Sequence, residues 1–270
     1  MSTGIRGQKG GRSAPSVLHA AYYSTQFWDG RAPSLEKQAE GPVQNPIEMG
    51  NTLDGAVRKL MAIADYRAEF ENAFGPGPIT YEMVAKSIAS FERTVISGNS
   101  PFDHYFYGGD KKALNRAARR GLAVFRNPKK GNCSSCHTIG EKYALFTDNK
   151  FHNLGVGVVS LPDRVELADL GRYQVSKKDA DRGAFKTPSL RNIALMAPYM
   201  HDGNLKTLKD VVDFYVGAGN SNPYRDQKMK PLDFLTGQER EDLVAFLGSL
   251  TGEMPPNAGP PKFKQLQAGK

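Results

Sequence analysis

The stretch Cys-Ser-Ser-Cys-His, residues 133 to 137, decides how the rest of the chain is interpreted. Its two cysteines are the only cysteines among the 270 residues, and the histidine follows the second one directly. Two thiols at this spacing can add to the two vinyl groups of one haem, and the adjacent imidazole can then reach the iron. The motif therefore predicts one covalently attached haem c, held by Cys133, Cys136 and the iron ligand His137.

Other uses of a Cys-x-x-Cys motif fit this sequence less well. A zinc site needs about four ligands, and the sequence has no second cluster of cysteine and histidine. A thioredoxin-like dithiol expects a strand-to-helix context and has no use for the following histidine. A redox dithiol or a structural disulfide is the alternative to haem attachment.

The segments around the motif have helical patterns. Residues 114 to 127, LNRAARRGLAVFRN, place apolar residues at the spacing of an amphipathic helix. Further on, Thr236 and Glu239 form a capping box before an apolar stripe that ends at Leu250. We therefore expect a mainly α-helical domain, because a bound haem replaces part of the core that a sheet would otherwise supply.

A third helix is predicted by TLKDVVDFYVG, where Thr207 precedes Asp210 by three positions. Tyr215 lies on its apolar face, so on spacing alone it is a core aromatic residue. The sharper alternative is that Tyr215 is the distal iron ligand. Met196 and Met200 are further candidates, although methionine is also a common core filler, and the distal position of such an iron can also stay open.

Length, charge and hydropathy exclude several classes of protein. The chain is long enough for one or two domains, and it has no apolar run that could form a membrane span. The N-terminal MSTGIRGQKGGR contains no signal-peptide h-region. The 36 Lys and Arg against 28 Asp and Glu give a net charge of +8, but no nucleic-acid motif accompanies them, so nucleic acid is not an expected partner.

Several separate stretches resemble the bacterial di-haem cytochrome c peroxidase family, including its MauG-like branch. They run from residue 1 to about residue 253 and are 13 to 52 (SAPSVLHAAYYSTQFWDGR onward), 91 to 105 (FERTVISGNSPFDHY), 133 to 140, 146 to 157 (FTDNKFHNLGVG), 181 to 203 (DRGAFKTPSLRNIALMAPYMHDG) and 207 to 219. The resemblance implies a two-domain architecture of cytochrome c-like haem domains whose first domain is truncated here.

The resemblance assigns roles in the C-terminal domain. Cys133, Cys136 and His137 match the attachment and proximal positions of the family's second haem. Tyr215 matches the distal ligand, which is methionine in ordinary peroxidases and tyrosine in MauG-like proteins, so it is favoured over Met200. The stretch 185 to 203 is expected to line this haem pocket and the domain junction, where His201 could form a hydrogen bond or line the path between haems.

The resemblance also assigns roles in the N-terminal region. Trp28, the only tryptophan, matches the residue that the family places between its two haems as an electron bridge. Glu48 matches the distal-pocket glutamate that helps to cleave peroxide at the first haem by moving a proton between the two oxygens. Without the resemblance, Trp28 would be interpreted as a packing residue and Glu48 as a solvated loop residue.

Three departures from the family pattern limit these expectations. The chain has no earlier Cys-x-x-Cys-His for the peroxidatic haem, so we expect an incomplete or mis-started reading frame and a second haem in a full-length form. No histidine stands near Ile5, where ordinary peroxidases have a switchable ligand. Ser13 replaces the asparagine of the family's calcium site, beside Met196 and Pro198, so calcium binding is not expected here.

The remaining histidines, His19, His104 and His152, have no ligand spacing to one another and are expected in core or surface roles. The predicted domains are 1 to 112, the remainder of the peroxidatic domain, and 113 to 253, the haem-bearing domain. A flexible tail is predicted from 254 to 270.

The expected function is a periplasmic haem c peroxidase that reduces hydrogen peroxide. Its electrons would come through the second haem from a small redox protein, a cytochrome c or a cupredoxin. The alternatives are a mono-haem electron-transfer protein and MauG-like oxidation of a partner protein. A homodimer is possible, because dimers are common in the family.

Overall fold

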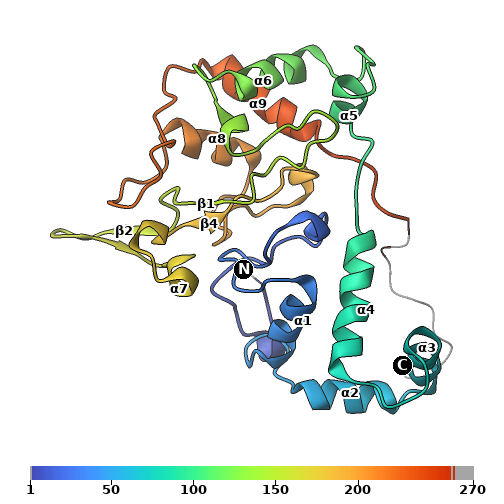
Figure 1. Cartoon of the computed structure of the whole chain (residues 1–270). Helices are drawn as coiled ribbons and strands as arrows, with labels where there is room; N and C mark the ends of the chain where they lie inside the picture. The colour runs from blue at the N-terminus through green and yellow to red at the C-terminus, as the bar shows by residue number, and fades with distance from the viewer. Residues whose placement is uncertain (1, 257, 259–270) are drawn as a thin grey trace.

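The chain forms two mainly helical lobes that meet at a junction crossed by loops and short strands (Figure 1). The computed structural model describes residues 2 to 256 and 258, so most of the predicted tail lies outside the described residues. The mainly α-helical fold class predicted from the sequence is confirmed. In this described part, no helix combines the length and the apolar character that crossing a membrane requires.

The N-terminal lobe, residues 2 to 98, consists of loops followed by a run of helices. Its elements are the 3-10 turns η1 (Ile5–Gly7) and η2 (Ala20–Tyr22) and the helices α1 (Leu35–Gln44), α2 (Leu53–Met61), α3 (Ala64–Phe74) and α4 (Tyr81–Thr94). The buried apolar cluster of this lobe is small and consists of Ala20, Leu35 and Ala89, with Tyr23 against it. Helices α2 and α3 bury no residue completely.

The C-terminal lobe, residues 99 to 256, contains the other helices and the strands. Its helices are α5 (Pro101–Phe106), α6 (Arg116–Arg126), α7 (Tyr173–Ser176), α8 (Leu208–Val216) and α9 (Gly237–Gly248), with 3-10 turns η3 (Cys133–Ser135), η4 (Asp179–Asp181) and η5 (Ile193–Leu195). Two antiparallel ribbons complete it, β1 (Phe151–His152) with β4 (Phe185–Lys186), and β2 (Val158–Ser160) with β3 (Val165–Leu167).

Four phenylalanines form the centre of the C-terminal core. Phe102, Phe125, Phe146 and Phe246 are almost completely buried and contact one another at ring centroid distances between 4.9 and 6.3 Å. Aromatic edge-to-face pairs of this kind add to the free energy gained from burying apolar area. Because Phe102 belongs to α5, that helix packs with the C-terminal core; the domain boundary at residue 112 stays a prediction.

The predicted helices form as the sequence patterns indicate. Helix α6 begins after Asn115, whose side chain accepts a hydrogen bond from the Ala118 amide, and it packs most extensively against α9. Their close approach depends on Gly121, because a Cβ at this position would collide with the carbonyl oxygen of Asp242. Both predicted capping boxes are present, at the starts of α8 and α9.

The two lobes contain copies of one loop. Residues 14 to 30, APSVLHAAYYSTQFWDG, and 187 to 203, TPSLRNIALMAPYMHDG, align without a gap. His19 and Asn192 hold equivalent positions, both with left-handed backbone, and each precedes a 3-10 turn. Their amides donate to equivalent carbonyls, that of Val95 after α4 and that of Leu250 after α9, both at 3.0 Å.

The equivalence continues into the helices. Ser34 caps α1 and Thr207 caps α8 at matching positions, so the N-terminal copy of Tyr215 is Pro42. Helix α4 is likewise the copy of α9. The segments that leave these two helices then pair with each other, since the Glu253 amide donates to the Gly98 carbonyl at 2.8 Å.

The copies differ in what covers the last helix. Leu243 and Phe246 of α9 are 5% and 0% exposed, because α6 packs against them. The equivalent residues of α4, Ile88 and Phe91, are 36% and 45% exposed. In the described part of the chain, α4 therefore has an apolar face without a counterpart of α6.

Candidate haem site and lobe junction

The Cys-x-x-Cys-His motif lies in a tight turn immediately after α6. Cys133 opens the 3-10 turn η3, and the His137 amide donates to the Cys133 carbonyl at 2.9 Å, so thiols and imidazole are held in one compact loop. The approach to this turn requires a glycine. A Cβ on Gly131 would lie 2.8 Å from the Val124 carbonyl oxygen and 3.2 Å from the Cys133 sulfur.

The His137 imidazole is aimed by a backbone carbonyl. Its Nδ1 lies 2.9 Å from the carbonyl oxygen of Phe146. Because a carbonyl oxygen only accepts hydrogen bonds, Nδ1 carries the proton and Nε2 keeps its lone pair. Burial lowers the pKa of His137, which also favours the neutral form. A neutral imidazole whose ring orientation is fixed and whose Nε2 carries no proton is what an iron ligand requires.

Tyr215 faces the same site from the last turn of α8. Burial raises the pKa of Tyr215 strongly, and the charges that the Cys133 and Cys136 thiols could carry raise it further, so the tyrosine is within electrostatic range of the motif. Burial likewise raises the pKa of Cys133 to about 12, so this thiol stays protonated. The motif and the predicted distal ligand are thus brought together by the fold.

The donors around this site fit a haem. Cys133, His137 and Tyr215 are all half-buried, and Tyr215 lies within electrostatic range of the thiols. No hydrogen bond of the Tyr215 hydroxyl is found among the described residues, so this oxygen is free to bind a ligand. Two thiols, a bare imidazole nitrogen and a free phenol are the chemical set for a covalent, axially ligated haem.

Met200 and His201 lie in the turn that leads to this lobe's junction with the other. Met200 has left-handed backbone with φ 68° and is half-buried. The buried His201 ring stacks on Phe185 at a centroid distance of 3.6 Å, and its carbonyl accepts a hydrogen bond from the Ser13 amide at 2.7 Å. His201 therefore lies at the junction of the two lobes.

A cluster beside Cys136 was not predicted from the sequence. His152 Nδ1 lies 2.5 Å from Asp226 and its Nε2 lies 2.9 Å from Asp148. The pKa of His152 is raised to about 10 by the Cys136 side chain and by these carboxylates. Once Cys136 forms a thioether, only the carboxylates contribute. Asp148 at four positions before His152 was the available sequence signal, but nothing in the sequence indicated the distant Asp226.

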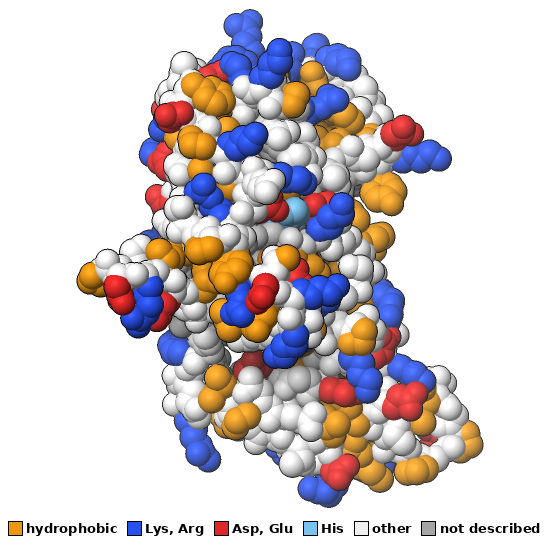
Figure 2. Space-filling view, turned by 60° about the vertical axis from the view of Figure 1, so that its left-hand side comes forward, with side chains coloured by type: hydrophobic (Ala, Val, Ile, Leu, Met, Phe, Trp, Pro, Cys, Tyr) orange, Lys and Arg blue, Asp and Glu red, His pale blue; other side chains and the backbone are white. Residues whose placement is uncertain are grey.

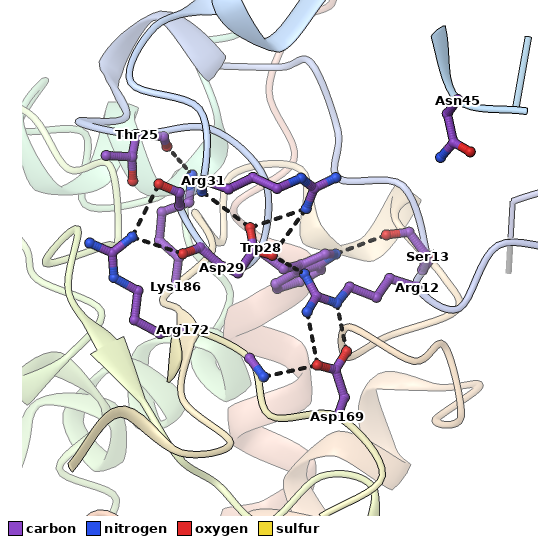
Figure 3. A network of polar contacts seen from close by, with 12 residues as sticks. Arg12, Ser13, Thr25, Trp28, Asp29, Arg31, Asn45, Asp169, Arg172 and Lys186 are labelled. Carbon is purple, nitrogen blue, oxygen red and sulfur yellow. Dashed lines mark hydrogen bonds and ion pairs between the residues drawn. The ribbon is translucent and has the colours of Figure 1, made fainter. Parts of the chain in front are cut away.

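Trp28 lies where the two lobes meet. Its indole Nε1 donates to the Ser13 carbonyl at 2.8 Å, and its own carbonyl accepts from the Lys186 amide of β4 at 2.8 Å. Figure 3 shows the indole beside the Arg12 side chain, with Ser13 at its nitrogen edge. The only tryptophan is thus fixed to both lobes at once, through its side chain and its backbone.

Charged side chains surround Trp28 and join the lobes (Figure 3). Arg12 donates to Asp29 at 2.6 Å and to both oxygens of Asp169 at 2.6 and 2.8 Å. Arg172 donates to the carbonyls of Asp29 and Gly30. Bidentate guanidinium–carboxylate pairs hold a fixed geometry, so this network fixes the orientation of the two lobes around Trp28.

Lys186 supplies a buried cation at the same junction. Its Nζ donates to the Thr25 carbonyl at 2.6 Å and lies 3.8 Å from the centre of the Tyr23 ring. Burial lowers its pKa to about 8. The ring and the carbonyl together partly compensate the cost of burying this charge.

Glu48 lies in the turn after α1, and one carboxylate oxygen accepts a hydrogen bond from the Asn45 side chain at 3.1 Å. Its carbonyl accepts from the Ile5 amide at 2.8 Å, so the N-terminal loop packs against this turn. Glu48 follows α1, the helix that contains Pro42, and Pro42 holds the position in the N-terminal repeat that Tyr215 holds in the C-terminal repeat.

Two further expectations concern Ser13 and the molecular surface. The Ser13 carbonyl accepts the hydrogen bond from Trp28. Among the described His, Cys, Asp and Glu side chains, the group that could hold a metal ion is Cys136, Asp148 and His152. On the face seen in Figure 2, Lys and Arg side chains are scattered over both lobes and interspersed with acidic ones.

Comparisons with known proteins agree with this geometry. The family model described as di-haem cytochrome c peroxidase matches residues 1–112, and the cytochrome c model matches residues 118–251. The methylamine utilization protein MauG of Methylorubrum extorquens is 40% identical over 245 residues, which cover 90% of this chain and 65% of that protein. The cytochrome c551 peroxidase of Pseudomonas aeruginosa is 37% identical, over 94% of this chain and 68% of that enzyme.

Solved structures show the same relationship. The crystal structure of a MauG-like protein associated with microbial copper homeostasis is 33% identical and has a TM-score of 0.79 over 93% of this chain and 79% of that one. The chain thus spans about two thirds of the length of the curated relatives named above. With its Cys-x-x-Cys-His site, its facing tyrosine and these likenesses, the chain belongs to the di-haem cytochrome c peroxidase and MauG family of oxidoreductases.

Proposed function

We propose that this chain is part of a periplasmic di-haem peroxidase that reduces hydrogen peroxide in its N-terminal lobe with electrons that enter through the C-terminal haem site. The observation that carries the proposal is that Cys133, His137 and Tyr215 belong to one half-buried site, with Trp28 fixed between this lobe and the other. A haem c, when bound, would supply the iron that exchanges electrons.

His137 and Tyr215 would be the axial ligands of that haem. His137 offers a bare Nε2, and Tyr215 offers a phenol whose pKa burial raises. A cationic metal favours the phenolate form of such a residue and overcomes this shift. Phenolate ligation stabilises oxidised iron, which suits a site that stores oxidising equivalents.

Trp28 would carry electrons between the lobes. Its indole is bonded to Ser13 in one lobe and its backbone to Lys186 in the other, so the aromatic ring has one fixed place in the junction. Arg12 and Asp169 keep that junction closed. A rigid aromatic bridge keeps the donor and acceptor at a constant separation, which electron transfer requires.

Glu48 would move the proton at the peroxidatic site. Its Asn45 contact fixes one oxygen and leaves the other for a substrate. In the equivalent copy of the loop, Pro42 stands where Tyr215 stands, and proline has no ligand atom, which favours an open position for peroxide. The exposed Ile88 and Phe91 face of α4 is the surface that a counterpart of α6, with its own haem, would cover.

The first test is the intact mass of the protein from its native host, under denaturing conditions that keep only covalent haem. A mass with two haems and an upstream segment supports the proposal. A mass of this chain with one haem favours the mono-haem electron-transfer protein instead. Peroxide consumption by Glu48→Gln and Trp28→Phe variants, against Glu241→Gln on the exposed side of α9, then separates the two roles.

A second candidate is the oxidation of side chains in a partner protein. Tyr215 and the likeness to MauG proteins, at 40% and 38% identity, favour it. Co-incubation of the loaded protein and peroxide with proteins from the same host, followed by mass spectrometry of oxidised residues, distinguishes it from simple peroxide reduction. We also propose that the electron donor is a small redox protein, a cytochrome c or a cupredoxin, and that the protein forms a homodimer.

A further inference from the structure

His19 is a buried histidine that the proposed reaction does not use. Its side chain is 2% exposed, and both ring nitrogens are buried without a hydrogen-bond partner among the described residues. A neutral imidazole has one N–H donor and one acceptor nitrogen. Leaving both unsatisfied in a folded protein costs free energy, so this position invites a functional explanation.

The repeat shows what the position could have held. Asn192, the equivalent of His19, is completely buried, but its side chain is fully engaged: it donates to Ser97 at 2.9 Å and accepts from the Gly252 amide at 2.7 Å. Both residues have the same left-handed backbone, φ 63° and φ 57°. The loop can therefore hold a side chain whose polar atoms all form hydrogen bonds, but the polar atoms of the His19 side chain form none.

Charged groups near His19 come from the other lobe. Arg191 of the 187 to 203 loop donates to both oxygens of Asp103 on α5, at 2.8 and 2.9 Å. Arg191 and Asp103 are the charged groups that act on the imidazole, and both belong to the other lobe. On the His19 turn itself the Tyr22 ring lies 6.4 Å away. The neighbouring helix α4 carries the buried Glu92, whose charge does not act on the imidazole, and the Val95 carbonyl after α4 accepts from the His19 amide. The Asp103 carboxylate is already paired, so it is not free to accept from a protonated His19.

We propose that His19 makes the seam between the two lobes sensitive to protons, so that acid opens the contact between the loop 14 to 30 and the segment around Arg191. Protonation would place a second N–H donor and a positive charge where neither finds an acceptor and where Arg191 repels it. The two N–H groups of the protonated ring can form hydrogen bonds only when water enters the contact between the lobes. The seam is thus closed at neutral pH and loosens in acid.

The sign of the effect follows from the environment. Burial and the Arg191 charge lower the pKa of His19 to about 4, below the ordinary histidine value of about 6.5. The closed state then binds fewer protons than the open state between these two values. Opening should therefore rise with falling pH, by up to about tenfold per pH unit, in this window.

Hydrogen exchange of the haem-loaded protein tests the proposal. The reporters are the amides of Lys186, Ser189 and Glu253, which donate across the lobe junction to the Trp28 carbonyl, the Tyr23 hydroxyl and the Gly98 carbonyl. The opening constant is obtained by dividing each measured exchange rate by the intrinsic exchange rate of an unprotected amide at the same pH. In the wild type this constant should rise about tenfold as the pH falls from about 6.5 to about 5. His19→Asn, which copies position 192, should lose this pH dependence, and the exposed His104→Asn should keep it.

Two outcomes overturn the proposal. First, the opening constant of the wild type could stay unchanged between these pH values, which contradicts the proposal. This result needs no variant, so it does not depend on whether a variant folds. A His19→Asn protein with the wild-type slope assigns the pH dependence to another group. Neither result bears on the haem content, so the proposed function stands or falls separately.

Discussion

Arg12 of the N-terminal lobe and Asp169 of the C-terminal lobe are joined by two parallel hydrogen bonds of 2.6 and 2.8 Å, and the same guanidinium reaches the buried Asp29. Arg12→Met should leave both carboxylates without this partner. Because the group is partly buried, we expect a loss of about 2–3 kcal/mol in the free energy of unfolding. Urea denaturation of the haem-loaded protein measures it.

The control is Arg164→Met, which removes exposed ion pairs with Asp163 and Glu166 and should cost less than about 1 kcal/mol. Arg12 contributes to lowering the pKa of Asp169, so its contribution is present above the ordinary carboxyl pKa and is lost as the pH falls. The difference between wild type and Arg12→Met should therefore shrink in acid; equal losses for both variants contradict this account.

Phe246 and Phe91 hold equivalent positions in the two repeats but differ in burial, so they test how much the cover over the helix contributes to stability. Phe246→Ala should destabilise the protein by about 3–5 kcal/mol, because it leaves a cavity among packed aromatic rings. Phe91→Ala removes the same side chain from an exposed position and should cost less than about 1 kcal/mol. Both values come from denaturation curves. In a longer form in which another helix covers α4, the Phe91 change should become costly.

Tyr215 can be examined by spectroscopy. If its phenolate binds iron, Tyr215→Phe should shift the ferric haem from a six-coordinate to a five-coordinate or water-bound spectrum, whereas Tyr215→Met should raise the reduction potential, because thioether ligation favours ferrous iron. Absorption and electron paramagnetic resonance spectra report both changes. Tyr143→Phe at the exposed surface is the matched control, and an unchanged Tyr215→Phe spectrum would make Tyr215 a packing residue.

His152 should anchor the loop that carries Asp226. Asp226→Asn removes the charged acceptor 2.5 Å from His152 Nδ1, and we expect a loss of about 1–2 kcal/mol near neutral pH. Because Asp226 and Asp148 raise the pKa of His152 above its ordinary value of about 6.5, the stabilisation is complete below that ordinary value and fades as the pH rises through the folded value.

Thermal unfolding at several pH values checks this direction. Asp233→Asn, an exposed change nearby in sequence, should have no comparable effect. A penalty for Asp226→Asn that grows with rising pH would falsify the role given to the charged imidazole.

The features predicted from the sequence are those encoded over short distances. Capping boxes at Thr207 and Thr236 require partners three residues away, and the haem motif requires five consecutive residues, so local chemistry was sufficient. The packing of Phe102 in the C-terminal core depends on partners far along the chain, which periodicity does not identify.

The site itself was predictable in part. The facing positions of His137 and Tyr215 came from the family resemblance, because helix spacing alone left Tyr215 as a core aromatic residue. The His152 contact with Asp226 joins residues that no spacing rule connects. The repeat between the loops at 14 to 30 and 187 to 203 was readable in the sequence, and it would have indicated that His19 stands where the other copy has Asn192.

Phe146 connects two properties that are usually considered separately. It has left-handed backbone with φ 54°, its ring is a wall of the aromatic core, and its carbonyl oxygen aims the His137 imidazole. A substitution such as Phe125→Leu, at a residue whose ring contacts Phe146 but which offers no ligand atom itself, should therefore turn the imidazole plane through this shared residue. Selection on the redox potential of such a protein therefore also acts on residues of its hydrophobic core. Changes in core packing and changes in redox potential should be correlated among related proteins.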